Sequence, residues 1–131
     1  MIVVDSNIVA YLYLPGEFTE SAERLLEREP EWTAPLLWRS ELRNILALLM
    51  RKKLLDFDQA FRIQREAEAL LADHEYDIDS FDVLKLARDS GCSAYDCEFI
   101  ALAMRLDVKL VTEDAKLRKA FPTVTMALSE G

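Results

Sequence analysis

The feature that most constrains the fold is the apolar run at the amino end of the chain. Ile2, Val3 and Val4 are β-branched, and the run stops at Asp5, which two small polar residues follow. A short continuous run of this kind is typical of a strand buried on both faces of a parallel sheet. Because open parallel sheets bind ligands at the carboxyl ends of their strands, the run predicts that Asp5 lies at a candidate site.

The rest of the chain alternates between helical and extended patterns. Helices are predicted at residues 8–13, from a cap at Thr19 or Ser21 up to Pro30, and at 36–55, 57–71, 81–88, 93–106 and 115–120. Strands are predicted at 32–34, 76–78 and 108–111, with a last short strand centred on Val124. Right-handed crossovers through helices of this length give an α/β fold whose parallel sheet is covered on both faces.

Length and composition favour a single domain that spans residues 1–131. A chain of 131 residues, 51% of them hydrophobic, can bury a core without disulfides or a structural metal. No apolar stretch is long enough to cross a bilayer, and Met1 leads directly into the predicted strand without the pattern of a signal peptide. We therefore expect a cytoplasmic protein.

The few histidine and cysteine residues argue against two classes of active site. Cys92 and Cys97 form no CxxC pair and have no histidine beside them, so we interpret them as buried reduced thiols. His74 is the only histidine, in an acidic stretch that we expect to be exposed. The sequence therefore disfavours triads with a histidine base and histidine-rich metal sites.

The charge of the chain is negative and unevenly distributed. A net charge of −8 argues against nucleic-acid binding, because phosphate contacts need Lys and Arg. The segment from Glu66 to Asp82 contains seven acids and no Lys or Arg, whereas Glu41 alone opposes a basic group that consists of Arg39, Arg43, Arg51, Lys52 and Lys53. A polyanion could approach that basic face; the alternative is that both segments are solvated helix surfaces.

Two acids follow predicted strands. Asp5 ends the first strand, and Asp114 follows strand 108–111 after Thr112 and Glu113. Each of these aspartates precedes a predicted helix, so the structural alternative is that it caps that helix. In a parallel sheet, however, both strand ends lie at the same edge.

Two further acids lie on predicted helices among apolar neighbours. The face that carries Glu41 is mainly apolar, and an unpaired carboxylate there would be costly. Glu41 therefore meets a basic group or a cation, or its face lines a cleft; the structural alternative is an ion pair with an arginine. Asp96 follows Ser93 in the pattern Ser-x-x-Asp, which a capping box explains, although its neighbour one turn later is apolar too.

Considered together, these four acids suggest one site at an edge of the sheet. Carboxylates in a cluster raise one another's pKa unless a cation compensates their charge. Oxygen ligands without histidine or cysteine select Mg²⁺ or Mn²⁺ rather than zinc.

Four segments together resemble the PIN-domain ribonucleases and, within them, the VapC-type toxins of prokaryotic toxin–antitoxin pairs. The segments are residues 4–7 (VDSN), 35–46 (PLLWRSELRNIL), 93–103 (SAYDCEFIALA) and 110–114 (LVTED). Their order, their spacing and the chain length agree with the family, so the resemblance covers essentially the whole chain. It departs from the family at Cys97-Glu98, where a small residue often follows the aspartate, and at Glu113, which adds negative charge.

The resemblance implies a three-layer α/β/α sandwich with a central parallel sheet and an acidic site for one or two Mg²⁺ or Mn²⁺ ions. Carried over residue by residue, the catalytic and metal-binding acids are Asp5, Glu41, Asp96 and Asp114. The supporting polar residues are Asn7 and Thr112.

The resemblance also implies an activity and partners. The activity is hydrolysis of RNA that leaves a 3′-hydroxyl and a 5′-phosphate, and the partners are a second copy of the chain in a homodimer and a small antitoxin protein. The candidate contacts for RNA phosphates are Arg39, Arg43, Arg51, Lys52 and Lys53.

Two other functions stay open at this point. An aspartyl phosphatase would use an acid after the first strand as nucleophile, but this chemistry usually needs a second acid two residues later, where Asn7 stands. A catalytically silent scaffold of the same fold, which binds RNA or a protein, is the other alternative.

Overall fold

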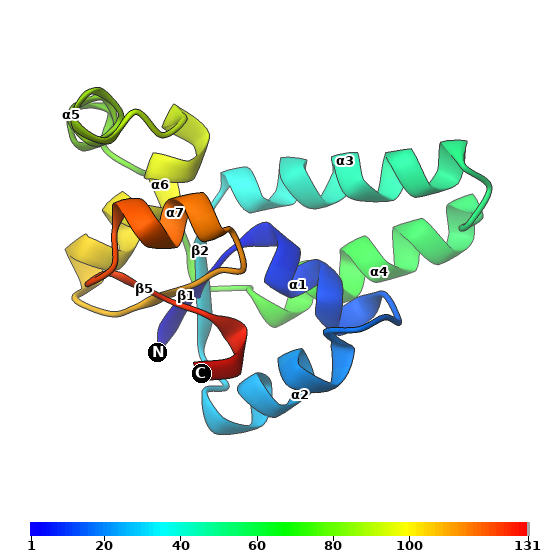
Figure 1. The fold of residues 1–131 in the computed structure, drawn as a ribbon. Coiled ribbons are helices and arrows are strands. Elements are labelled where there is room, and N and C mark those ends of the chain that lie inside the picture. The colour runs from blue at the N-terminus through cyan, green and yellow to red at the C-terminus, as the bar shows by residue number, and fades with distance from the viewer. Residues whose placement is uncertain (131) are drawn as a thin grey trace.

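A five-stranded parallel sheet forms the centre of the computed structural model, which describes residues 1–130 (Figure 1). The strands are β1 (Ile2–Val4), β2 (Trp32–Pro35), β3 (Glu75–Tyr76), β4 (Leu110–Val111) and β5 (Thr125–Met126). Their order is β3-β2-β1-β4-β5, and every neighbouring pair is parallel. The predicted α/β fold with a parallel sheet is confirmed.

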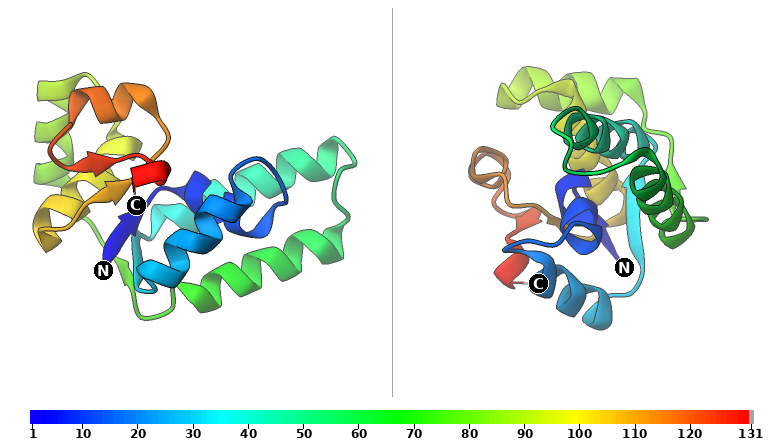
Figure 2. Two further views of the ribbon diagram at one scale, coloured as in Figure 1. Left: turned by 60° about the horizontal axis from the view of Figure 1, so that its bottom comes forward. Right: turned by 90° about the vertical axis from the view of Figure 1, so that its right-hand side faces the viewer.

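Seven helices connect the strands. They are α1 (Ser6–Tyr13), α2 (Thr19–Arg28), α3 (Leu37–Arg51), α4 (Phe57–Leu70), α5 (Ser80–Ser90), α6 (Ala94–Leu106) and α7 (Ala115–Ala120), and a 3₁₀ turn, η1 (Leu128–Glu130), follows β5. Right-handed crossovers put α1 to α4 on one face of the sheet and α5 to α7 on the other. The paired helices α3 and α4 extend away from the sheet (Figures 1 and 2). None of these helices is long and apolar enough to span a membrane.

The strand order reverses between β1 and β4. The chain proceeds from β1 to β2 and β3 on one side, and then returns to β4 on the other side of β1. Val4 pairs with Val111, and the Asp5 amide donates to the Val111 carbonyl at 3.1 Å. The segments that follow β1 and β4 therefore lie side by side at a topological switch point, which is where open α/β sheets bind ligands.

The core explains why the central strands are so apolar. Val3, Val4 and Leu110 are fully buried between the two helical layers, and α6 packs against β1, β2 and β4. Cys92 and Cys97 are buried free thiols, as predicted.

Several element boundaries differ from the prediction; for example, β4 begins at Leu110 rather than at 108, and α1 begins at Ser6 rather than at residue 8. Helix α3 ends at Arg51 rather than near residue 55, because Lys53 adopts a left-handed φ of 60° and a capping box between Asp56 and Gln59 begins α4. Strand β3 begins and ends earlier than predicted. Val124 precedes β5 instead of forming its centre, although its carbonyl accepts a hydrogen bond from the Leu110 amide at 2.8 Å.

Candidate active site

All four predicted acids line one open pocket at the carboxyl ends of β1 and β4. The cavity has a volume of about 400 Å³. Its lining residues are Asp5, Ser6, Asn7, Leu37, Ser40, Glu41, Asn44, Ile45, Tyr95, Asp96 and Asp114. None of these lining residues is Lys or Arg, so the lining itself contains no base to balance the carboxylates.

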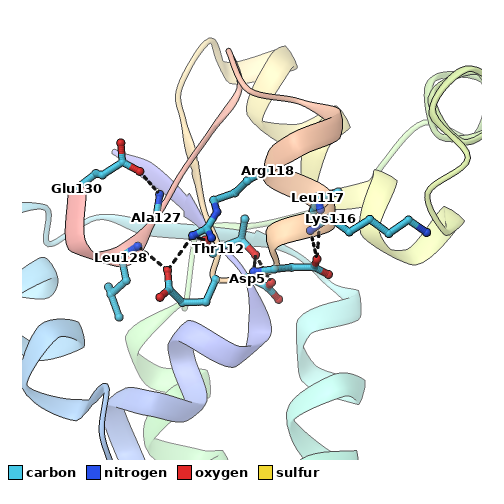
Figure 3. Close-up of polar contacts among 10 residues, drawn as sticks. Asp5, Thr112, Lys116, Leu117, Arg118, Ala127, Leu128 and Glu130 are labelled. Carbon is cyan, nitrogen blue, oxygen red and sulfur yellow. Dashed lines mark hydrogen bonds and ion pairs between the residues drawn. The ribbon is translucent and has the colours of Figure 1, made fainter.

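The carboxylate of Asp5 is directed to the chain after β4. Its Oδ2 accepts a hydrogen bond from the Thr112 hydroxyl at 2.7 Å (Figure 3). Within residues 1–130 the Asp5 side chain makes no full capping hydrogen bond to α1, although the backbone amides of Asn7 and Ser6 lie close enough to lower the pKa of its carboxyl. Burial raises the pKa of the Asp5 carboxyl, the bond from Thr112 opposes that rise, and the nearby charge of Asp96 adds to it.

Thr112 connects two of the acids. It is fully buried, and its Oγ1 also accepts a hydrogen bond from the Asp114 amide at 3.1 Å. The Oδ1 atom of Asp114 accepts from the amides of Lys116 and Leu117 at 3.0 and 3.1 Å. Asp114 therefore caps α7, as the structural alternative had it, and also lines the pocket.

Glu41 is held by a serine rather than by a base. The Ser6 hydroxyl donates to Glu41 Oε1 at 2.7 Å, so the ion pair proposed as the structural alternative is wrong. Burial raises the pKa of the half-buried Glu41 carboxyl, and the charges of Asp5 and Asp96 raise it further, while the bond from Ser6 lowers it.

Asp96 lies in the first turn of α6. Its amide donates to the Ser93 hydroxyl at 3.0 Å, which is one half of the predicted capping box. The reciprocal bond, from the Ser93 amide to the Asp96 carboxylate, is not formed in residues 1–130. Burial raises the pKa of the Asp96 carboxyl, and the charge of Asp114 contributes in the same direction.

The pocket contains the supporting residue Asn7 and several polar residues that we did not predict. Ser6, Ser40, Asn44 and Tyr95 complete its polar lining. Helical periodicity offered a signal for two of them, because Asn44 lies about one turn after both Glu41 and Ser40.

The predicted phosphate contacts lie outside the pocket. The Arg39 guanidinium forms two hydrogen bonds to Glu75, with Nε 2.6 Å from Oε2 and Nη2 2.7 Å from Oε1, so Glu75 already offsets its charge. Arg43 lines a separate groove between α3 and α4. Arg51, Lys52 and Lys53 lie at the far end of α3 or just beyond it, about 15 Å or more along the helix axis from Glu41.

The pocket has the donor type that a hard cation prefers, but not a finished coordination sphere. Its charged groups are all carboxylates, accompanied by hydroxyl and amide oxygens, which suits Mg²⁺ or Mn²⁺. Within residues 1–130, no group of three or more His, Cys, Asp or Glu side chains is placed so that it could hold an ion as it stands. An ion bound by three of the acids would therefore require their side chains to move closer together.

Comparison with known proteins gives one consistent result. The model of the PIN domain family matches residues 2–121. Over 136 aligned residues the chain is 33% identical to Ribonuclease VapC3 of Pyrobaculum aerophilum, and the alignment covers 94% of this chain and 96% of that protein. FitAcB from Neisseria gonorrhoeae has the same fold, with a TM-score of 0.75, 19% identity and full coverage of both chains. So does a toxin-antitoxin complex from Klebsiella pneumoniae, with a TM-score of 0.73, 18% identity and 98% coverage of each chain.

Proposed function

The chain belongs to the PIN domain family and, within it, to the VapC-type proteins. From this premise we propose that it is a Mg²⁺- or Mn²⁺-dependent endoribonuclease and the toxin of a toxin–antitoxin pair. The observation that carries the proposal is the convergence of Asp5, Glu41, Asp96 and Asp114 on one pocket whose lining contains no base. Partly buried like charges cost free energy, and a purely structural role does not explain why four of them meet. The name of the relative from Pyrobaculum aerophilum supports RNA as the substrate.

These four acids are the residues that would hold the ion. Burial, with smaller contributions from neighbouring carboxylates, raises the pKa values of Asp5, Glu41 and Asp96, so a cation bound in the pocket would favour their ionised forms. When bound, the ion lowers the pKa of a water molecule and stabilises the charge that develops on the phosphate.

The protein contributes the orientation of the carboxylates. Ser6 and Thr112 each donate to a single oxygen of an acid, and the α7 amides bind a single oxygen of Asp114. Side chains fixed by such secondary contacts bind a metal ion more tightly than free ones, because less ordering accompanies binding.

We assign the binding of RNA away from the cut bond to Arg43, Arg51, Lys52 and Lys53. All four side chains are exposed on α3 or just after it, and Glu41 lies near the other end of the same helix. RNA that lies along this helix would reach both the basic residues and the pocket. Arg39 is left out because Glu75 occupies its guanidinium.

The antitoxin and a second copy of the chain are the protein partners that we propose. A groove of about 430 Å³ between α3 and α4 is mainly apolar, and the solved toxin-antitoxin complex has the same fold, which supports an antitoxin segment as its occupant. The exposed Phe81 and Leu84 on α5 and Met104 on α6 support the homodimer.

The first test is RNA cleavage by Asp5→Asn. Purified wild-type protein should cleave RNA with Mn²⁺, whereas Asp5→Asn should lower the rate about a hundredfold or more, because asparagine cannot supply the charge that holds the ion. The circular dichroism spectrum should not change, since the asparagine oxygen can still accept from Thr112.

A matched control and two other outcomes complete this test. Asp58→Asn changes an exposed aspartate on α4 that lies outside the pocket, and it should cleave RNA at the wild-type rate. Full cleavage by Asp5→Asn, or by the wild type in EDTA, would contradict the proposal. Wild-type protein that neither cleaves RNA nor binds Mn²⁺ would indicate the silent scaffold, and a phosphoaspartate trapped at Asp5 would indicate the phosphatase.

A further inference from the structure

The loop between β4 and α7 sets the position of two site residues. It consists of residues 112–114, and its first and last members are Thr112 and Asp114. Thr112 holds Asp5 through its hydroxyl, and the Asp114 amide donates to that same hydroxyl. A change in the backbone of this short loop would therefore displace Asp114 and release Asp5 together.

Glu113 lies between these residues, but it is not part of the pocket lining. Its Oε2 accepts two hydrogen bonds, from the Leu128 amide at 2.9 Å and from Arg118 Nη1 at 3.2 Å. Arg118 also donates to the Thr112 carbonyl, at 3.4 Å. The side chain and the backbone of the loop are thus attached to η1 and to α7 through residues outside the pocket lining.

Both partners of this contact are partly shielded from solvent. The Glu113 side chain is 24% exposed and the Arg118 side chain 30%. A further carboxylate beside four acids would ordinarily increase their repulsion, but Arg118 offsets the charge of Glu113. The contact therefore adds a hydrogen-bond acceptor to the loop without adding much net charge near the pocket.

We propose that Glu113 is a positioning residue for the metal site: through Leu128 and Arg118 it holds the loop so that Thr112 and Asp114 face Asp5. The C-terminal turn η1 thereby contributes to metal affinity without touching the ion. This inference rests on the proposed function, because it assigns Glu113 to the orientation of the same four acids.

Three substitutions distinguish an effect of the loop's position on Mn²⁺ binding from an effect of its charge. Glu113→Gln removes the charge but keeps an oxygen that can accept from Leu128, whereas Glu113→Ala removes both. Arg118→Met removes the other half of the contact and makes the surroundings of the pocket more negative, so electrostatic attraction alone would tighten Mn²⁺ binding.

The measurement is the Kd for Mn²⁺ by calorimetry, with the folded state checked by circular dichroism. We expect about tenfold weaker binding for both Glu113→Ala and Arg118→Met, and a change within about threefold for Glu113→Gln, as for other residues that orient metal ligands indirectly. Glu130→Ala is the control: Glu130 caps its own turn through the Ala127 amide at 2.9 Å, in the same tail, and this substitution should leave the Kd unchanged.

Several results would overturn this inference. One is a wild-type Kd for Mn²⁺ in Glu113→Ala, and another is tighter Mn²⁺ binding in Arg118→Met. A third is a loss of Mn²⁺ affinity in Glu130→Ala as large as that in Glu113→Ala, because this would indicate a general weakening of the C-terminal turn. If Glu113→Ala does not fold, Arg118→Met decides alone. A wild-type protein that binds no Mn²⁺ would instead contradict the proposed function, so the two failures are distinguishable.

Discussion

Two hydroxyl groups, those of Ser6 and Thr112, each hold one carboxylate of the acidic pocket. Ser6 is buried, and its bond to Glu41 joins the first residue of α1 to α3. Serine beside an aspartate at a strand end also fits a turn, so sequence alone offers no reason to connect it with an acid that lies 35 residues later.

Removal of the Ser6 hydroxyl should affect both stability and activity. Ser6→Ala leaves Glu41 without its donor, and we expect the free energy of unfolding to fall by about 1–2 kcal/mol, the range for a hydrogen bond to a charged group. The kcat/KM for RNA should fall as well, because Glu41 is then less well oriented. Urea unfolding and cleavage assays measure the two effects. Ser80→Ala, at an exposed serine that begins α5 outside the pocket, is the control and should change neither quantity greatly.

The charge of Glu41 should lower the stability of the metal-free protein, although the proposed reaction needs that charge. The pKa of Glu41 is raised in the folded protein, so its ionised form costs folding free energy at neutral pH. We expect Glu41→Gln to raise the free energy of unfolding of the metal-free protein by up to about 1 kcal/mol while it abolishes cleavage. Urea unfolding in EDTA is the measurement. A less stable Glu41→Gln protein would show that the charge of Glu41 is already compensated without metal.

At the level of elements, an ion pair fixes the start of α3 against the edge strand β3. Glu75 binds Arg39 with both carboxylate oxygens and also accepts from the Trp38 indole nitrogen at 2.8 Å. Arg39 and Trp38 precede Glu41 by about one turn or less, so this contact helps to set the direction in which α3 carries Glu41.

This ion pair predicts the pH dependence of stability. The hydrogen bond from Arg39, with smaller help from Trp38, lowers the pKa of Glu75 below its ordinary value of 4.5. Because the folded pKa is lower than the unfolded one, the contribution is fully present above pH 4.5 and is lost as the pH falls from there through the folded pKa.

Glu75→Gln should therefore be less stable than the wild type at pH 7, by about 1–2 kcal/mol, since Arg39 is partly exposed. The difference should shrink below pH 4.5, where the unfolded wild-type carboxyl takes up a proton. Urea unfolding of both proteins between pH 7 and pH 3.5 tests this, with the exposed Glu66→Gln as control. A difference that does not vary with pH would contradict the electrostatic explanation.

Element types were predictable where the local pattern was unambiguous. The β-branched run at Ile2 to Val4 and the helix at 115–120 follow directly from the sequence. The end of α3 did not, because the residues after Arg51 continue the helical pattern, and the left-handed turn at Lys53 depends on the packing of α3 against α4. Lysine at this position carries no turn signal of its own.

For the whole molecule, a bound ion should be a stabilising ligand. At a Mn²⁺ concentration about one hundred times the Kd, the free energy of unfolding should rise by about 2.7 kcal/mol, because only the folded chain brings the acids together. Thermal unfolding with and without Mn²⁺ measures this rise. Asp96→Asn should lose most of it, whereas Asp58→Asn should keep it; an equal rise in Asp96→Asn would place the ion elsewhere.

The candidate site was predictable in its acids but not in its contacts. Strand ends and apolar helix faces predicted Asp5, Glu41, Asp96 and Asp114, because parallel topology brings strand ends to one edge. The pairing of Arg39 with Glu75 was not predictable, since it joins residues 36 positions apart on different elements. The orientation of the Glu113 side chain could not be predicted from the sequence either, because it depends on where η1 packs.

The bond between Asp5 and Thr112 spans 107 positions of the chain and has a consequence for biosynthesis. A ribosome synthesises β1 before β4, so the hydroxyl that orients Asp5 emerges 107 residues after Asp5 itself, and the fourth carboxylate emerges after that hydroxyl. A nascent chain that has reached only α6 carries three of the acids and lacks β4, the strand that brings the rest beside them. The nuclease that we propose would therefore be unable to cut RNA until β4 and the loop after it have been synthesised and are in place.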